Sequence, residues 1–277
     1  MVVLKKRAVA TVIVVIMLFS SYIASASRQD GIPVLLYHHV GNDDGGLPRL
    51  TITADEFERQ VALLHNAGFE TISPEQLIAY MKREEVSLPE RPILITFDDG
   101  YDDNYANALP ILQKYGFKAV FFVVGINVDR AQRLSAQQVR EMAKSGFAIG
   151  GHSMTHSDLT QLSGPELEHE ILDNKRQLEG ITHQESLFFS YPYGFFNLRS
   201  WKKIESAGYQ GAFTVLSGVN KAGRDNIFLL RRIPIFSTTD FDALLARLTG
   251  TYSAHMLLDY LPEHMDSIIN SATDGLL

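Results

Sequence analysis

Four aspartates lie close together in the segment Ile95–Tyr105, which reads ITFDDGYDDNY. They form two adjacent pairs, Asp98–Asp99 and Asp102–Asp103, directly after an apolar run that is typical of a buried strand. Neighbouring carboxylates repel one another, which raises their pKa values and destabilises the fold unless a cation or hydrogen bonds offset the repulsion. The cluster is therefore either a solvated turn or part of a site for a positive charge.

Two histidines at a spacing of four residues, His152 and His156, follow Gly150 and Gly151 in the segment IGGHSMTH. The spacing predicts that both imidazoles lie on one side of a helical turn, where they can chelate one metal ion. The pattern is weak by itself and also occurs as a surface pair. Its position at the end of a predicted strand favours metal binding, because active sites of parallel α/β folds gather at the carboxyl ends of strands.

Two histidines and one carboxylate leave positions open for water and substrate, as in catalytic metal sites. One residue of the Asp98–Asp99 pair is then expected to bind the ion. Its neighbour is expected to take a proton from bound water, whose pKa such an ion lowers to about 7. Asp102 and Asp103 are interpreted as a solvated turn and the start of a helix.

Two further strand ends are predicted to face the same site. Tyr37 is followed by His38 and His39, and only one of these histidines should face the site because side chains alternate along a strand. The segment YPYG offers a constrained turn at Pro192 and Tyr193 with backbone N–H groups. An aromatic loop that packs on the core is the alternative interpretation of this turn.

Strands that alternate with helices indicate a parallel sheet with helices outside it. About seven βα units predict a barrel of the triose-phosphate-isomerase type, either complete or incomplete in closure. No Gly-rich dinucleotide turn follows any predicted strand. Pro110 predicts a kink in its helix. The predicted strands are Ile32–Tyr37, Phe69–Ile72, Ile93–Phe97, Ala119–Val124, Phe147–Ile149, Leu187–Phe189, Ala212–Val215 and Phe228–Ile233.

Composition limits the classes of function. The chain has 277 residues, of which 45% are hydrophobic, enough for one large α/β domain. The net charge of −7 argues against a general affinity for nucleic acid. Because the chain has no cysteine, a metal must be held by His, Asp or Glu.

The N-terminal segment predicts an extracytoplasmic protein. Lys5-Lys6-Arg7 precede an apolar run from Ala8 to Phe19, and Ala24-Ser25-Ala26 has the small-x-small form of a cleavage site. Residues 1–26 are therefore expected to be a signal peptide or an N-terminal membrane anchor, which makes the protein secreted or cell-surface associated. Residues 27–250 are expected to form the working domain, and residues 251–277 a tail or an extra helix.

Three motifs resemble those of the polysaccharide deacetylases, carbohydrate esterase family 4, which share the NodB homology domain. They are TFDDG (residues 96–100), HSMTH (residues 152–156) and YPYG (residues 191–194). The resemblance implies that Asp98 is the general base and that Asp99, His152 and His156 bind the metal. It also implies that Pro192 and Tyr193 form a wall of the sugar pocket and that the Tyr193 N–H contacts the oxyanion.

The chain departs from that family pattern at two places. Ser190 stands where the third motif usually has an arginine that braces the base, and Arg232 is expected to replace it, with Arg231 as the alternative. Typical members carry the histidine that acts as general acid near the C-terminal end of the catalytic domain, and no such motif occurs late in this chain. Instead LLYHH occurs at the first predicted strand. This order resembles a circularly permuted branch, the poly-β-1,6-N-acetyl-D-glucosamine N-deacetylases of biofilms, and places the catalytic acid on His38, with His39 as the alternative.

The resemblance implies a distorted, circularly permuted (β/α)7-type barrel and a metal-dependent N-deacetylase. Its expected substrate is the N-acetylglucosamine of an extracellular polysaccharide, in biofilm formation. Peptidoglycan or chitin are alternative substrates, and a non-catalytic carbohydrate-binding protein or a small-molecule amidase are alternative functions. One divalent ion is expected as cofactor, zinc in the first place, with cobalt or nickel as alternatives.

Overall fold

The computed structural model describes residues 31–42 and 45–250. The chain divides into two compact units, and residues 30–239 form the larger one. In the other unit the described part is residues 240–250, which contain helix α9 (Phe241–Thr249), capped by the Asp240 side chain. The predicted signal or anchor at residues 1–26 and the predicted tail at residues 251–277 lie outside the described residues.

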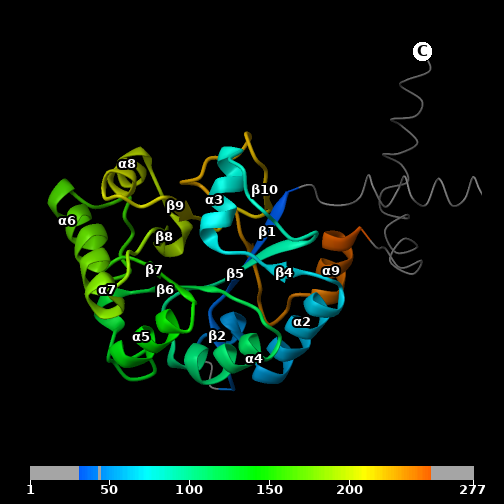
Figure 1. Ribbon diagram of the computed structural model, residues 1–277. Coiled ribbons are helices and arrows are strands. Elements are labelled where there is room, and N and C mark those ends of the chain that lie inside the picture. Colours follow the sequence, from blue (N-terminus) through cyan, green and yellow to red (C-terminus); the bar gives the residue numbers. More distant parts are fainter. Residues whose placement is uncertain (1–30, 43–44, 251–277) are drawn as a thin grey trace, which may run out of the picture. The chain divides into compact units, whose positions relative to one another are not determined.

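The larger unit contains a nine-stranded sheet in which strands β1, β5, β6, β7, β8 and β9 are parallel neighbours (Figure 1). Antiparallel β10 and parallel β11 also pair with β1, and β4 pairs with the start of β5. The strands are β1 (Ile32–Tyr37), β4 (Glu70–Thr71), β5 (Pro92–Phe97), β6 (Val120–Val123), β7 (Ala148–Gly151), β8 (Phe188–Ser190), β9 (Gly211–Phe213), β10 (Val219–Asn220) and β11 (Ile233–Pro234), with β2 (His39–Val40) and β3 (Thr51–Ile52) as a separate pair.

The segment 230–235 lies between β9 and β1. Leu230 forms a parallel bridge with Phe213 of β9, and β11 pairs with β1 at Leu35 and Leu36. Together with β1, β5, β6, β7, β8 and β9 this segment forms a curled, barrel-like sheet, which confirms the predicted distorted (β/α)7-type fold.

Helices of the larger unit surround the sheet (Figure 1). Thr53 and Ser73 accept hydrogen bonds from the first turns of α2 and α3, as their positions before apolar periodic segments predict. The helical segments are α2 (Ala54–Asn66), α3 (Pro74–Lys82), α4 (Leu109–Lys114), α5 (Ala136–Lys144), α6 (Gly164–Glu168), α7 (Asn174–Thr182) and α8 (Leu198–Ser206), the 3-10 turns η1 (Pro48–Leu50), η3 (Gly125–Asn127) and η5 (Pro192–Gly194), and the π turns η2 (Asn104–Ala108) and η4 (His169–Asp173).

Two helices contain a π turn. The interruption predicted near Pro110 is the turn η2, which precedes α4, and there the Leu109 N–H bonds to the Asn104 carbonyl five residues back. Proline lacks the N–H of a regular helix, and the wider turn accommodates this loss. The second π turn, η4, joins α6 to α7. It contains no proline or glycine from which the irregularity could be predicted.

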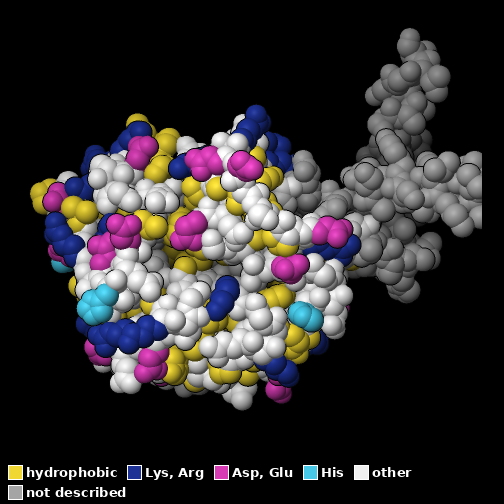
Figure 2. All heavy atoms as spheres, in the orientation of Figure 1, with side chains coloured by type: hydrophobic (Ala, Val, Ile, Leu, Met, Phe, Trp, Pro, Cys, Tyr) yellow, Lys and Arg dark blue, Asp and Glu magenta, His cyan; other side chains and the backbone are white. Residues whose placement is uncertain are grey.

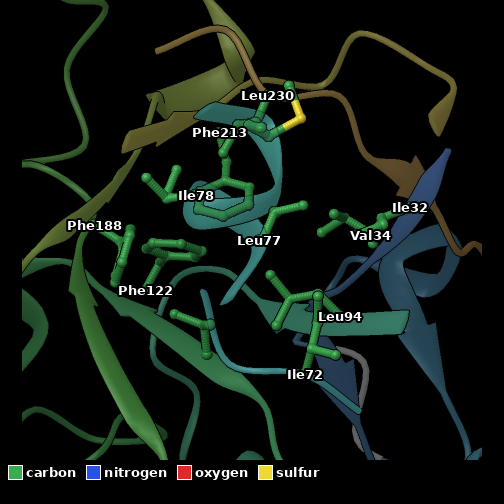
Figure 3. Packing of buried hydrophobic residues seen from close by; sticks show 12 residues of the cluster. Ile32, Val34, Ile72, Leu77, Ile78, Leu94, Phe122, Phe188, Phe213 and Leu230 are labelled. Carbon is green, nitrogen blue, oxygen red and sulfur yellow. The ribbon is translucent and has the colours of Figure 1, made fainter. Parts of the chain in front are cut away.

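Helix α3 closes the end of the barrel near the amino ends of the strands. Figure 3 shows Leu77 and Ile78 between the side chains of Val34, Phe122 and Phe213. All five side chains are almost fully buried. Removing this apolar surface from water contributes about 25 cal/mol per Å² to folding, so this end supplies stability.

Acidic and basic side chains are interspersed on the face shown in Figure 2. Among the described residues, ion pairs at the surface include that of Lys203 with Glu168. None of the helices within residues 31–42 and 45–250 is long and apolar enough to cross a membrane.

Candidate metal and base site

The polar residues predicted from the sequence meet at the carboxyl ends of the strands. Asp98 and Asp99 follow β5, His152 follows β7, and Ser190 ends β8. His38 follows β1. The parallel order of these strands brings together side chains that are more than 100 positions apart in the chain.

A buried ion pair holds the predicted base. Asp98 Oδ1 and Oδ2 each accept a hydrogen bond of 2.8 Å from the Arg232 guanidinium. Ser190 Oγ donates to Asp98 Oδ2 at 3.0 Å and accepts from Arg232 Nη2 at 2.8 Å. Arg232 Nε donates to the Thr214 carbonyl, so both charged groups are bonded on several sides.

The structure distinguishes between the two arginines that the sequence left open. Arg232 has no exposed surface and contacts Asp98, whereas Arg231 bonds to Asp225 and to the Ser217 carbonyl. Arg232 therefore occupies the bracing position. Burial by itself raises the pKa of Asp98, but the charges of Arg232 and His152 and the hydrogen bonds from Arg232 outweigh this effect, and the pKa lies below its usual value.

Three ligand atoms gather beside this pair. The Nε2 atoms of His152 and His156 each lie 3.3 Å from Asp99 Oδ1, and the ligand atoms of the three residues all lie within 4.8 Å of one another. Ligand atoms about 2.1 Å from a tetrahedral ion lie about 3.4 Å apart, so these separations fit one ion.

The hydrogen bonds of His152 prepare it for this role. Its Nδ1 lies 2.8 Å from the Ser190 carbonyl oxygen, which can only accept. Nδ1 therefore carries the proton, and Nε2 presents its lone pair toward Asp99. Tyr101 Oη donates to Asp99 Oδ2 at 3.2 Å and leaves Oδ1 facing the histidines. The donor set fits a divalent ion.

The segment between the two histidines is not the helical turn that their spacing predicted. Ser153 and His156 both have left-handed backbones with φ of 62°, and Ser153 Oγ accepts a hydrogen bond from the His156 N–H. The two imidazoles come together because the loop folds back on itself. The predicted pair of histidines is therefore brought together, but the helical turn predicted from their spacing is wrong.

The glycines before His152 are required by close packing of the strands. A Cβ atom on Gly150 would lie 2.5 Å from the Phe122 ring, and one on Gly151 would lie 2.5 Å from Tyr209 Oη. Only glycine lets β7 approach its neighbours this closely. The pair thus sets the position from which His152 enters the site.

The two histidines that follow β1 have different surroundings. His39 Nδ1 bonds to Asp103 Oδ2 at 2.7 Å, and its ring stacks on Tyr101. His38 lies near enough to Asp98 and Asp99 for their negative charges to act on its pKa. Burial lowers the pKa of His38, and the two carboxylates offset part of that change.

Asp103 lies at the start of the helix, as predicted, but its side chain is not solvated. Its side chain is 16% exposed and is bonded to His39 and to the Asn104 side chain. Asp103 thus supports the segment after β1 through His39.

The turn η5 lies beside the metal ligands. Tyr193 has a left-handed backbone with φ of 58°, and its side chain is 56% exposed. Its ring packs edge-on against His156 with centroids 4.5 Å apart. A Cβ on Gly194 would lie 2.3 Å from Val215, so the turn requires glycine there. Tyr193 thus borders the candidate site, and Pro192 directly precedes it in the turn.

Sequence reasoning missed the residues that support the ligands. Tyr101 carries no predicted role, and Ser190 is predicted only as the residue that stands in place of an arginine. Glu170 and Asn174, which bond to the histidine loop, carried no local signal at all. The contacts of Ser190, Glu170 and Asn174 join different segments, so no spacing within one motif reveals them, whereas Tyr101 is only two residues from Asp99.

Comparison with known proteins identifies the family. The sequence profile described as "Polysaccharide deacetylase" matches residues 85–212, from β5 to β9. The YxkH protein of Bacillus subtilis, provisionally named a polysaccharide deacetylase, is 34% identical over 205 residues, 74% of this chain and 71% of its own. The chain therefore belongs to the polysaccharide deacetylases, carbohydrate esterase family 4.

Two further relatives differ in their named substrates. The peptidoglycan-N-acetylglucosamine deacetylase of Bacillus cereus is 38% identical over 142 residues, which are 51% of this chain and 63% of that one. The poly-β-1,6-N-acetyl-D-glucosamine N-deacetylase of Staphylococcus aureus is 26% identical over 216 residues, 72% of each chain.

Solved structures agree with this assignment of the fold. The deacetylase PplD of Streptococcus pyogenes superposes with a TM-score of 0.73 at 27% identity, over 79% of this chain and 99% of that one. IcaB from Ammonifex degensii superposes with a TM-score of 0.70 at 26% identity, over 81% of this chain and 99% of that one. The barrel is thus the polysaccharide deacetylase fold.

Proposed function

We propose that this protein is a metal-dependent N-deacetylase that removes acetyl groups from the N-acetylglucosamine units of an extracellular polysaccharide. The observation that carries the proposal is the direct juxtaposition of two groups. One is the ionised carboxylate Asp98, held by Arg232, and the other is the cluster of three ligand atoms from Asp99, His152 and His156. A base beside a metal site is the arrangement that amide hydrolysis needs.

The metal is held in this proposal by Asp99 Oδ1 and by the Nε2 atoms of His152 and His156. Zinc suits these ligands best, and cobalt or nickel also suit them. A bound ion would polarise the acetyl carbonyl and lower the pKa of a water molecule. Tyr101 and the Ser190 carbonyl orient two of the three ligands.

Asp98 is the group that takes the proton from the attacking water. Arg232 and Ser190 keep its carboxylate ionised and fixed in orientation, because both donate to it. The N–H of Tyr193 is the proposed donor to the oxyanion, and Pro192 and Tyr193 border the sugar.

His38 is the proposed acid that protonates the departing amine. Its lowered pKa makes the protonated imidazole a stronger acid, while Asp98 and Asp99 favour the protonated form. An amine leaves poorly without such a proton. His39 is committed to Asp103 and is therefore the weaker candidate.

The preferred substrate of the proposal is poly-β-1,6-N-acetyl-D-glucosamine in biofilms. Its support is the extent of the similarity to the Staphylococcus aureus relative, which covers 72% of both chains. The higher identity to the Bacillus cereus relative, over 51% of this chain, favours peptidoglycan as the second candidate.

The test is acetate release by the purified chain from β-1,6-linked N-acetylglucosamine oligomers, peptidoglycan and chitin oligomers, after chelation and after return of zinc, cobalt or nickel. Metal-restored release from the β-1,6 oligomers alone is the expected result. Release from peptidoglycan alone would keep the chemistry and overturn the substrate. No release with any ion would overturn the enzymatic proposal.

A matched pair of variants tests the acid. His38→Ala is expected to lower kcat by roughly 10²–10⁴-fold at unchanged metal content, because a general acid is removed. His39→Ala should lower it far less once the protein is folded and loaded. Equal activity of the two variants would contradict the assignment of His38.

We also propose that residues 1–26 direct the chain out of the cytoplasm as a signal peptide or membrane anchor. The basic residues, the apolar run and the small-residue site support this. Fractionation of cells, with N-terminal sequencing of the mature protein, distinguishes the two forms. Recovery of the uncleaved chain in the cytoplasm would overturn both.

A further inference from the structure

The loop that carries the two histidines is held in a costly conformation. Ser153 and His156 are both left-handed, which costs a non-glycine residue of the order of 1 kcal/mol or more and persists only where surrounding contacts enforce it. The middle of the loop is fixed by the backbone of η3, through Gly125 N–H to Ser153 and Ile126 N–H to Met154. The two ends need separate support.

That support comes from one helix, the run α6–η4–α7 on the outer side of β7 (Figure 1). Asn174 has no exposed surface, and its Oδ1 accepts a hydrogen bond of 3.1 Å from the His152 N–H. Its Nδ2 donates to the Val123 carbonyl at 3.2 Å. Asn174 thus fixes the first end of the loop to the neighbouring strand β6.

Glu170 fixes the other end. Its side chain is almost fully buried, with 4% of the residue exposed. Oε2 accepts from the Thr155 N–H at 2.8 Å, and Oε1 accepts from Thr155 Oγ1 at 2.6 Å. Since the single hydroxyl proton of Thr155 goes to Glu170, Ser157 Oγ donates to Thr155. Both carboxylate oxygens therefore hold the residue that directly precedes His156.

A buried carboxylate without a basic partner needs a reason. Within the described residues no Lys, Arg or His forms an ion pair with Glu170, so its hydrogen bonds to Thr155 are what offset the cost of burial. Glu170 lies in the π turn η4, four positions before Asn174. Such turns frequently mark functional positions, and here the turn supplies side chains to both ends of the loop.

We infer that Glu170 is a positioning residue for the metal: through Thr155 it fixes the backbone of His156 so that Nε2 faces Asp99 Oδ1. The inference rests on the metal site of the proposed function. Partners of this kind, one contact removed from the ligands, typically change metal affinity by 10–100-fold when they are lost. Glu170 touches neither substrate nor metal, so its effect is on the ligand.

The test measures zinc affinity by competition with a chelator and the visible spectrum of the cobalt-loaded full chain. Glu170→Gln replaces one acceptor oxygen by an NH₂ group and is expected to weaken zinc binding roughly tenfold or more and to change the cobalt spectrum. Thr155→Val should weaken binding in the same direction, whereas Thr155→Ser, which keeps the hydroxyl, should restore it. The double variant should be no worse than the stronger single one, because both break the same contact.

The matched control is Glu168→Gln, on the same helix. Glu168 is exposed and pairs with Lys203, so zinc affinity should stay within about twofold of the wild type. Unfolding of the metal-free variants separates the two kinds of role. A loss of stability in Glu170→Gln with wild-type zinc affinity and an unchanged cobalt spectrum would overturn the inference, and Thr155→Val decides if that variant does not fold. Wild type that binds neither ion would instead overturn the metal site itself.

Discussion

The two ends of the barrel bury their side chains for opposite reasons. At the end closed by α3, Leu77 and Ile78 are buried among apolar side chains, and nothing there needs a partner. At the other end Asp98 and Arg232 are buried equally deeply, at 3% and 0% exposure, and each needs several hydrogen bonds. Apolar burial is favourable by itself, whereas buried charge is tolerated only when it is fully paired.

This contrast teaches that stability and chemistry are separable in this fold. The apolar end can lose volume without moving a catalytic atom. At the polar end, removal of the charge of Asp98 or Arg232 is expected to lower activity, because these charges lie where the reaction is proposed to occur. Three variants and one change of pH test that separation.

The largest effect is expected for Asp98→Asn. The amide cannot take the proton, so kcat should fall by roughly 10²–10⁴-fold. Metal content should stay at the wild-type value because Asp98 is not among the ligand atoms. Acetate release and metal analysis measure the two quantities. Activity within tenfold of the wild type would show that another group is the base, and Asp102→Asn serves as the control.

The apolar end is tested by Leu77→Ala. Removal of a fully buried leucine side chain is expected to lower the free energy of unfolding by about 2–5 kcal/mol. Below the unfolding transition, kcat should remain within about twofold of the wild type, since α3 contributes no residue to the candidate site at the carboxyl ends of the strands. Urea denaturation and acetate release measure the pair of values. A large loss of kcat in folded protein would break the comparison.

Ser190→Ala removes one donor to Asp98 and one acceptor for Arg232 but keeps the carbonyl that bonds to His152. Hydrogen bonds to charged groups contribute about 1.5–3 kcal/mol, so a similar loss of stability is expected. The activity should fall by less than in Asp98→Asn. Metal affinity should not change, and a large loss of zinc binding would mean that the alanine displaces the strand end.

Acidification should weaken the polar end alone. The pKa of Asp98 is lower in the folded chain than its ordinary value near 3.9, so Asp98 stabilises the fold above that value. This stabilisation is lost as the pH falls through the folded-state pKa, with a slope of at most about 1.4 kcal/mol per pH unit. In metal-free protein, Leu77→Ala should keep this dependence and Asp98→Asn should lack it. Identical acid profiles of all three proteins would contradict it.

Local patterns predicted much of this molecule, and their limits are physical. Alternating apolar runs and amphipathic helices predicted the barrel, because strand and helix periodicities are local properties. The candidate residues at the strand ends were also found locally, since each motif occupies one short segment. The π turn η4 was not predicted, because no proline or glycine marks it.

The contacts that the sequence left open or missed join different segments of the chain. The sequence favours Arg232 but leaves Arg231 open, and the structure separates them by burial and by their bonds to Asp98 and Asp225. Glu170 reaches Thr155 across a turn of helix and a loop. A sequence window sees neither pairing, since both depend on where the strands place their ends.

Ser190 meets both halves of the site at one backbone position, with its carbonyl on His152 and its hydroxyl on Asp98. A shift of β8 by one residue would misalign the metal ligand and the base together. Insertions and deletions are therefore poorly tolerated between Phe188 and Tyr191. Changes in loop length are expected instead after the turn η5. The contacts of Ser190 with His152 and Asp98 do not depend on the length of those loops.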